Sequence, residues 1–168
     1  MQSIDVLQHA SQLSRISLTG LYYETGAARN EAVRIHNGGY MIISAQSSGP
    51  QSTNSSSWTA MPQLSIKIPG GSGEMVLLIL NVPNPYATGN SNPGGNFGIE
   101  VNGVLQPATA TFTYNEVNPP STGRIPTTLC VPYLVNSQNP SVVTAVWSNV
   151  RGSTVHIDSP ATLSAVAG

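Results

Sequence analysis

Short runs of apolar and β-branched residues, each closed by glycine, proline or asparagine, dominate the chain from Trp58 onward. Runs of this length between turn-forming residues are typical of β-strands. The expected strands are Gln63–Ile68, Met75–Val82, Asn96–Val101, Ala108–Tyr114, Thr127–Leu134, Val142–Trp147, Ser153–Asp158 and Thr162–Val166. Strands at such regular spacing predict an all-β fold, either a sandwich or a jelly roll.

Residues 1–40 differ from the rest of the chain. Apolar residues recur there every three positions, at Ile4, Leu7, Ala10, Leu13 and Ile16. This spacing is close to the apolar stripe of an amphipathic helix. We therefore predict an N-terminal extension over residues 1–40, with a possible helix over residues 3–18, and a jelly-roll domain over residues 41–168. The extension is either a frayed segment or a short oligomerisation stalk, and the sequence leaves both interpretations open.

Two local features carry further expectations. The single cysteine, Cys130, excludes a disulfide within the chain, and its apolar surroundings predict a buried thiol that packs as a small hydrophobic residue. Residues 46–57 are almost entirely polar, with repeated serines. Such a composition buries little apolar surface, so we expect an unpacked loop over this segment.

Low charge excludes several classes of function. Only 8% of the 168 residues are charged, and the six Lys and Arg side chains form no cluster. Binding to nucleic acid or to an anionic membrane surface needs several basic side chains on one face, so neither is expected. The sequence contains no apolar run of about 20 residues, so no membrane-spanning helix is expected. The N-terminus also lacks a secretory signal pattern, so the chain either stays inside the cell or leaves it by another route, to be secreted or held at the cell surface.

One expected strand has no polar face. The run Met75–Leu80 is apolar at every position. In an antiparallel sandwich one face of a strand normally meets water. A strand that is apolar on both faces needs a second cover besides its own core. We expect a neighbouring subunit to provide it.

Polar chemistry is concentrated in two short segments, residues 121–124 and 150–159. His156 and Asp158 would point to the same face of a strand, because side chains alternate along it. Arg124 and Arg151 add two guanidinium groups to these side chains and to nearby hydroxyls. Forked donors beside a carboxylate acceptor suit a neutral, hydroxyl-rich ligand such as a sugar.

Each of these residues also has a structural interpretation when it is taken singly. Arg151 and Asp158 could form an ion pair that holds their strand. Arg124, which follows Ser-Thr-Gly, could be a solvated turn residue. His156 could be a structural histidine with satisfied hydrogen bonds, and aromatic residues near the site could lie at the edge of the core.

Longer motifs connect the same residues. They are Ile79–Asn90, Phe112-Thr113-Tyr114, Ser121-Thr122-Gly123-Arg124, Trp147, Val150-Arg151-Gly152-Ser153, His156-Ile157-Asp158-Ser159 and Leu163-Ser164-Ala165. Through these motifs the chain resembles the TNF-like bacterial fucose-binding lectins, of the type found as the N-terminal domain of a two-domain superlectin. The resemblance extends from about Trp58 to Gly168.

The resemblance implies a TNF-like jelly roll that assembles as a homotrimer. Each fucose site would lie between two protomers, would need no metal or other cofactor, and would bind fucosylated glycans on cell surfaces. The fucose-contacting positions of the family fall on Tyr86, Thr113, Tyr114, Ser121, Thr122, Arg124, Arg151, His156, Asp158 and Ser159. Tyrosine rings there would offer apolar surface to the methyl group of a 6-deoxy sugar.

Two positions depart from the family pattern. Asn96 stands where a family member has tyrosine, and Pro120 stands where it has glutamate. Both positions would touch the rest of the oligosaccharide beside the fucose. They therefore predict an extended-glycan subsite whose preference differs from that of the family member.

Two other classes of function were weighed against a lectin. A glycosidase needs two carboxylates that flank the scissile bond. The β-rich region offers only Glu74, Glu100, Glu116 and Asp158, and it contains no nucleophile-elbow or zinc-protease motif. We therefore expect no catalytic residues and no enzyme activity. The alternative to a lectin is a structural or receptor-binding trimeric head, tail-fibre-like or cytokine-like, that binds no sugar.

Overall fold

The chain folds into antiparallel β-strands joined by turns and loops. The computed structural model describes residues 30–34, 41–71, 73–89, 91–116 and 123–168, and no helix occurs among them. The strands are β1 (Asn30–Arg34), β2 (Met41–Gln46), β3 (Gln51–Thr53), β4 (Thr59–Ile68), β5 (Glu74–Val82), β6 (Pro85–Thr88), β7 (Gly94–Val101), β8 (Val104–Leu105), β9 (Ala110–Thr113), β10 (Thr127–Val135), β11 (Ser141–Val150), β12 (Thr154–Ile157) and β13 (Thr162–Ala167). The all-β prediction is confirmed.

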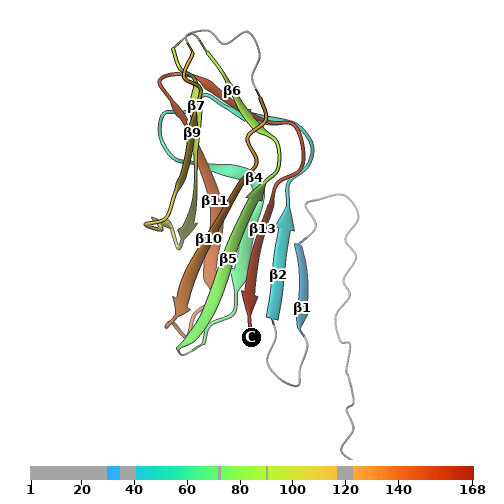
Figure 1. Ribbon diagram of the computed structural model, residues 1–168. Helices are drawn as coiled ribbons and strands as arrows, with labels where there is room; N and C mark the ends of the chain where they lie inside the picture. Colours follow the sequence, from blue (N-terminus) through green and yellow to red (C-terminus); the bar gives the residue numbers. More distant parts are fainter. Residues whose placement is uncertain (1–29, 35–40, 72, 90, 117–122) are drawn as a thin grey trace, which may run out of the picture.

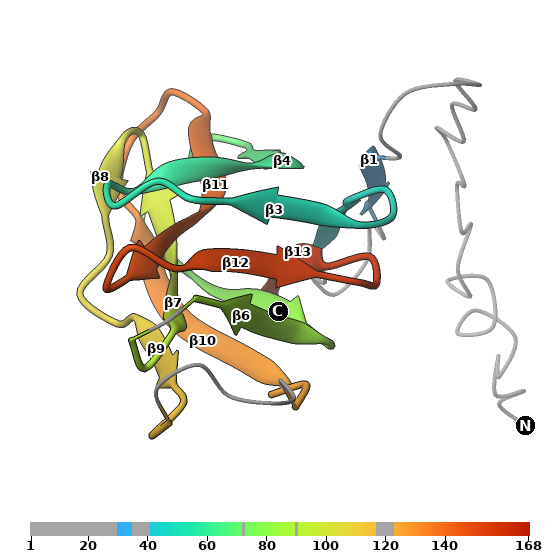
Figure 2. The same cartoon turned by 90° about the horizontal axis from the view of Figure 1, so that it is seen from above.

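Three antiparallel sheets make up a jelly-roll sandwich (Figure 1). The front sheet has the order β1-β2-β13-β5-β10. The back sheet has the order β4-β11-β7-β8, with β9 also paired to β7. The upper sheet has the order β3-β12-β6, which Figure 2 shows from above. Every strand that was expected from an apolar run is present in one of these sheets.

The core lies between the inner faces of the front and back sheets. Alternate residues of each strand point inward, as a period of two requires. The core includes Leu78 and Leu80 of β5, Phe97 of β7 and Trp147 of β11, and all four side chains are at most 2% exposed. Each fully buried side chain of this size contributes about 1.5–3 kcal/mol relative to exposure. A core of this size holds the sandwich together without a disulfide.

The upper sheet continues three strands of the front sheet across a bend. The chain passes from β2 to β3, from β5 to β6 and from β12 to β13, and each pair is separated by only a few residues. In the front sheet β13 lies between β2 and β5, and in the upper sheet β12 lies between β3 and β6. The bend therefore brings three short connections together at one place. Polar residues of two of these connections, Asn84 and Ser159, meet there.

The polar segment over residues 46–57 is better ordered than its composition predicts. Its central residues form β3, which pairs with β12. Ser47 is buried, and its hydroxyl accepts a 2.9 Å hydrogen bond from the backbone N–H of Ala161. The expectation of an unpacked loop is wrong, because backbone pairing with a neighbouring strand does not require apolar side chains in β3.

The N-terminal predictions fall mainly outside the described residues. The helix expected over residues 3–18 and the proposed stalk both lie there. β1 belongs to the predicted extension, and its backbone pairs with β2 in the register Asn30 to Ala45. The boundary at residue 40 stays a prediction. Within the described ranges, no helix is long and apolar enough to cross a membrane.

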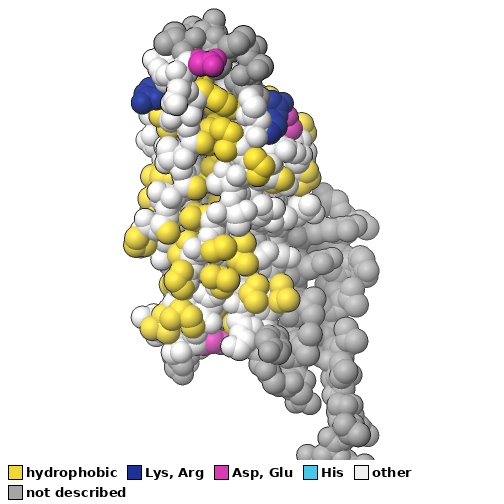
Figure 3. Space-filling model, in the orientation of Figure 1, with side chains coloured by type: hydrophobic (Ala, Val, Ile, Leu, Met, Phe, Trp, Pro, Cys, Tyr) yellow, Lys and Arg dark blue, Asp and Glu magenta, His cyan; other side chains and the backbone are white. Residues whose placement is uncertain are grey.

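The outer face of the front sheet carries exposed apolar side chains. Ile42, Met75, Leu77 and Leu134 are 41–57% exposed there, and Figure 3 shows hydrophobic side chains gathered over this sheet. Cys130 is exposed on the same face, opposite Ile79, so the expectation of a buried thiol is wrong. In β10 the residues that alternate with Cys130, not Cys130 itself, face the core. The cover expected over this face stays a prediction.

Candidate functional site

The upper sheet presents Tyr86 and His156 side by side on its outer face. Their strands pair in register at these two residues, while Val155 and Ile157 point inward and are fully buried. The two rings stack with their centroids 4.7 Å apart and their planes 14° from parallel. The imidazole Nε2 also lies 3.1 Å from the hydroxyl of Thr88. Strand pairing thus stacks the aromatic rings of two residues that are distant in sequence.

Arg124 reaches this surface from the segment that precedes β10. The backbone N–H of Ile125 donates a 3.0 Å hydrogen bond to the carbonyl of Pro85, which holds this segment against β6. The guanidinium carbon lies 3.8 Å from the centroid of the Tyr86 ring, in a cation–π contact. Arg124, Tyr86 and His156 therefore form a layered stack of guanidinium, phenol and imidazole.

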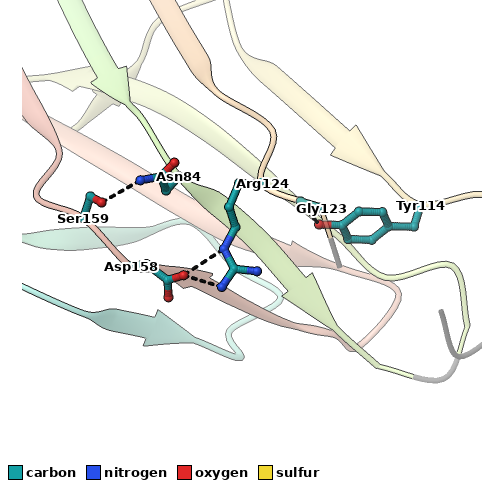
Figure 4. A network of polar contacts seen from close by, with 6 residues as sticks. All are labelled: Asn84, Tyr114, Gly123, Arg124, Asp158 and Ser159. Carbon is teal, nitrogen blue, oxygen red and sulfur yellow. Dashed lines mark hydrogen bonds and ion pairs between the residues drawn. The ribbon is translucent and has the colours of Figure 1, made fainter. Parts of the chain in front are cut away.

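Asp158 holds the guanidinium from the side. Nε of Arg124 donates a 2.8 Å hydrogen bond to Oδ2 of Asp158, and Nη2 donates a second, shorter one to the same oxygen (Figure 4). The two side chains are 41% and 38% exposed, so the pair contributes about 1 kcal/mol or less to stability. The structural interpretation in which Arg151 pairs with Asp158 is wrong, because the ion pair of Asp158 is with Arg124.

Two further hydrogen bonds fix the surroundings of the pair. Nδ2 of Asn84 donates to the hydroxyl of Ser159 at 2.6 Å, and the hydroxyl of Tyr114 donates to the carbonyl of Gly123 at 2.5 Å (Figure 4). The first bond joins the two connections at the bend of the sheets. The second tethers the segment that carries Arg124 to the end of β9.

Burial sets the charge of two aromatic groups. Partial burial lowers the pKa of His156 below its usual 6.5; Asp158 opposes this effect and Arg124 adds to it. The imidazole is therefore neutral at pH 7 and does not repel the nearby guanidinium. Burial also raises the pKa of Tyr114 above 10.0. Its hydroxyl stays protonated and remains a hydrogen-bond donor.

A second group of predicted residues lies around Gly94 of β7. Gly94 pairs with Thr113 on one side and with Val150 on the other, so the turn that carries Arg151 lies close to Thr113. Nη1 of Arg151 donates a 3.2 Å hydrogen bond to the carbonyl of Asn92. Arg151 thus has a different partner from Arg124. Thr113 and Arg151 thus form a second group of predicted fucose contacts, and Tyr114, which follows Thr113 and bonds to Gly123, lies between this group and Arg124.

The remaining predicted positions have separate outcomes. Asn96, of the expected extended-glycan subsite, donates to the hydroxyl of Ser148 at 3.0 Å and accepts from the hydroxyl of Thr111 at 2.8 Å. Ser121, Thr122 and Pro120 lie outside the described residues. Their roles stay predictions.

Sequence reasoning did not single out three polar residues that contact the predicted set. Asn84 bonds to Ser159, Thr88 contacts His156, and the carbonyl of Asn92 accepts from Arg151. Asn84 and Thr88 lie inside the motif Ile79–Asn90, which was the only signal for them. Their partners are distant in sequence, so the contacts follow from strand pairing alone.

Donors, an acceptor and ring surface thus meet at an exposed edge of the molecule. Such a surface can hydrogen-bond to hydroxyl groups and pack against an apolar patch of a small ligand. No cluster of three or more potential metal ligands of the His, Cys, Asp and Glu types occurs in the part of the chain that the structure describes.

Comparison with known families identifies the domain. The family model of Bc2l-C, N-terminal domain, matches residues 40–166. The chain belongs to the Bc2l-C N-terminal domain family. This is a family of lectin domains, and the match agrees with the resemblance found in the sequence. The match extends from β2 to the penultimate residue of β13 and therefore includes all predicted contact positions.

Other comparisons are more distant. No significant match exists among curated proteins. Dimeric latent PorU from Porphyromonas gingivalis is similar over 91% of this chain, with 18% identity and a TM-score of 0.47, and the chain spans 14% of the PorU chain. The CBM36-1 domain of a multidomain xylanase from the hindgut metagenome of Trinervitermes trinervoides is 14% identical, with a TM-score of 0.33, over 91% of this chain and 90% of that domain. Both are too distant to bear on function.

Proposed function

We propose that this protein is a lectin that binds L-fucose and fucosylated glycans at sites shared between neighbouring protomers of a homotrimer. The observation that carries the proposal is the guanidinium of Arg124, which Asp158 fixes from the side and Tyr86 supports from below. Because the guanidinium is already held in place, little side-chain entropy remains to be lost when a ligand binds.

The chemistry of this surface suits a 6-deoxy sugar. Adjacent ring hydroxyls both donate and accept hydrogen bonds, so they match a guanidinium next to a carboxylate. The methyl group of fucose needs an apolar surface, which the partly exposed ring of Tyr114 can supply. The proposed site needs no metal, because the guanidinium of Arg124 and the carboxylate of Asp158 themselves supply a charged donor and a charged acceptor for the sugar hydroxyls.

The division of the contact residues supports a shared site. One group, on the upper sheet and the segment before β10, contains Arg124 and Asp158, and the other, around Gly94, contains Thr113 and Arg151. In the proposed trimer, the second group of one protomer faces the first group of its neighbour. The exposed apolar face of the front sheet would provide the contact between protomers.

A single fucose site of this kind is expected to be weak, with a Kd of about 1 μM to 1 mM. Three sites on one trimer raise the apparent affinity for a glycan-coated surface without any new contact. A trimer that binds no sugar, the alternative function, would share the apolar face. A trimer of that kind would have no need for the stacking and hydrogen bonds that hold the Arg124 side chain.

Isothermal titration calorimetry with methyl α-L-fucoside tests the proposal. We expect binding by the wild type with or without EDTA. Arg124→Ala and Arg151→Ala should each lower the affinity about tenfold to a hundredfold, through loss of charge-assisted hydrogen bonds. Lys67→Ala removes an equal charge from β4 and should bind as the wild type does.

Two results would overturn the proposal. One is a wild type that gives no heat with the fucoside, and the other is a pair of arginine variants that bind as tightly as the wild type. Light scattering on the same samples separates a lost site from a lost trimer, since the alanine variants should keep the oligomeric mass of the wild type.

A further inference from the structure

Trp58 lies on the outer face of the back sheet, apart from the core. It immediately precedes Thr59, which pairs with Trp147 at the start of β4. A methyl group at Gly98 would lie 3.3 and 3.4 Å from Cζ3 and Cη2 of the indole and 2.8 Å from Cδ1 of Leu105, so the six-membered ring lies against this glycine next to Leu105. Gly98 has no side chain, which lets the ring approach the sheet closely.

A second residue beside Gly98 also points away from the core. Val146 pairs with Gly98 and alternates with the core residues Ala145 and Trp147. It is only 1% exposed although it does not belong to the core cluster. Trp58 itself is only partly buried, so part of its indole meets solvent beside these residues.

Polar side chains border this ring on the side toward the proposed fucose site. Asn96 shares the outer face with Gly98, and its side chain is held by Ser148 and Thr111. Thr113 follows Thr111 on the same face of β9. Residues two apart on a strand are separated by about 6.8 Å, which is the scale of one pyranose ring. A continuous strip thus leads from Thr113 past Asn96 to Trp58.

We propose that this strip binds the sugar residues that extend from fucose, with Trp58 as the platform on which the outermost of them stacks. The inference rests on the proposed function, because Thr113 marks the end of the strip at which the fucose would lie. The ligand is a neutral fucosylated oligosaccharide of two to four residues. Glu100, on the same face, disfavours an acidic sugar at the platform.

The chemistry of the strip supports this class of ligand. A tryptophan ring offers a flat, rigid apolar surface at a low cost in conformational entropy, and it suits the apolar face of a hexose. The hydrogen bonds of Asn96 fix the orientation of its amide beside that ring. Because the chain carries few charges, long-range electrostatic attraction between the protein and a charged ligand is small, which agrees with a neutral ligand.

Binding of two ligands to three proteins tests the inference. The ligands are methyl α-L-fucoside and a neutral fucosylated tetrasaccharide, and the proteins are the wild type, Trp58→Ala and Trp58→Phe. We expect Trp58→Ala to lower tetrasaccharide affinity about two- to tenfold and to leave fucoside affinity unchanged. Trp58→Phe should restore part of the loss, because a smaller ring still stacks.

Tryptophan fluorescence of the wild type provides a readout that needs no variant. The chain has two tryptophans, and Trp147 is 2% exposed, so a ligand-induced change in emission reports on Trp58. We expect the tetrasaccharide to change the emission and the fucoside to leave it unaltered.

The possible results separate the two proposals. If the wild type binds neither ligand, the proposed function fails and this inference fails with it. If the wild type binds the fucoside, but Trp58→Ala leaves tetrasaccharide affinity unaltered or weakens both ligands equally, this inference alone is overturned.

Discussion

Arg151 occupies a backbone conformation that arginine rarely adopts. Its φ is 55°, the following Gly152 has a φ of 68°, and the N–H of Ser153 donates a 3.2 Å hydrogen bond to the carbonyl of Val150. A tight turn with two left-handed residues, here between β11 of the back sheet and β12 of the upper sheet, favours asparagine followed by glycine. The turn at Asn102 and Gly103, with φ values of 52° and 78°, has that sequence. Arginine at this position costs about 1 kcal/mol, which points to a role beyond folding.

Arg151→Asn should therefore separate stability from binding. We expect the free energy of unfolding to rise by about 0.5–1 kcal/mol, because asparagine tolerates the left-handed region better. Fucoside affinity should fall at least about tenfold. Chemical denaturation and calorimetry on the same preparation measure the two effects.

The turn at Asn102 and Gly103 offers a control, although its variant also loses the hydrogen bond that Oδ1 of Asn102 accepts from the N–H of Val142. Asn102→Arg introduces the same strain in a turn outside the proposed site, so it should lower stability and leave fucose binding unaltered. An Arg151→Asn variant that binds fucoside as the wild type does would remove Arg151 from the site.

At the scale of elements, close packing of β9 on β7 positions Thr113. A methyl group at Gly94 would lie 2.2 Å from the carbonyl oxygen of Phe112 and 3.0 Å from the Cα of Thr113. Both are backbone atoms of β9, so no side-chain rotation could relieve the contact. Glycine at position 94 is thus a requirement of strand pairing, and this pairing also brings Thr113 beside the turn of Arg151.

Gly94→Ala should push β9 away from β7. We expect a loss of about 1–3 kcal/mol in the free energy of unfolding, in the range typical of overpacking, together with weaker fucose binding. Urea denaturation measures the first effect. Gly49→Ala is the control, because no atom lies within 4 Å of the added methyl group and the backbone there is unstrained. Equal stability of the two variants would show that β9 does not need this contact.

At the scale of the whole molecule, the front sheet has a divided outer face. Near the bend, the face is polar, with Asn81 and Thr128 paired across β5 and β10. Farther along, Leu77 pairs with Pro132 and Val166, and Met75 pairs with Leu134. Four strands contribute to this apolar area, and a contiguous exposed patch of this kind marks an interaction surface.

Leu77→Lys places a charge in the centre of this area, where Leu77 is 41% exposed. If the face joins protomers, burial of an unpaired charge should disrupt the trimer. Light scattering should then give the monomer mass, and fucoside binding should be lost because each site needs two protomers.

Val104→Lys is the matched control. Val104 is 65% exposed, more than Leu77, but it lies in β8 of the back sheet. It should keep the mass and the binding of the wild type. A Leu77→Lys variant that stays trimeric would place the interface elsewhere, and a monomer that still binds fucoside would contradict a shared site.

The sequence by itself determined the fold class and the strands with apolar runs. Alternation of inward and outward residues is a local property with a period of two, so β5, β10 and β11 could be located from their own residues. The same pattern showed that β5 is apolar on both faces. β3 and β6 were not foreseen, because three or four residues carry too little pattern to distinguish a strand from a loop.

Only the tertiary structure decided which residues meet. Asp158 pairs with Arg124 and not with Arg151, and Tyr86 stacks on His156, because β6 and β12 pair in one particular register. Trp58 lies against Gly98 because β4, which follows Trp58, and β7, which contains Gly98, both pair with β11. Register depends on how strands distant in sequence pack around one core, and no local pattern encodes it.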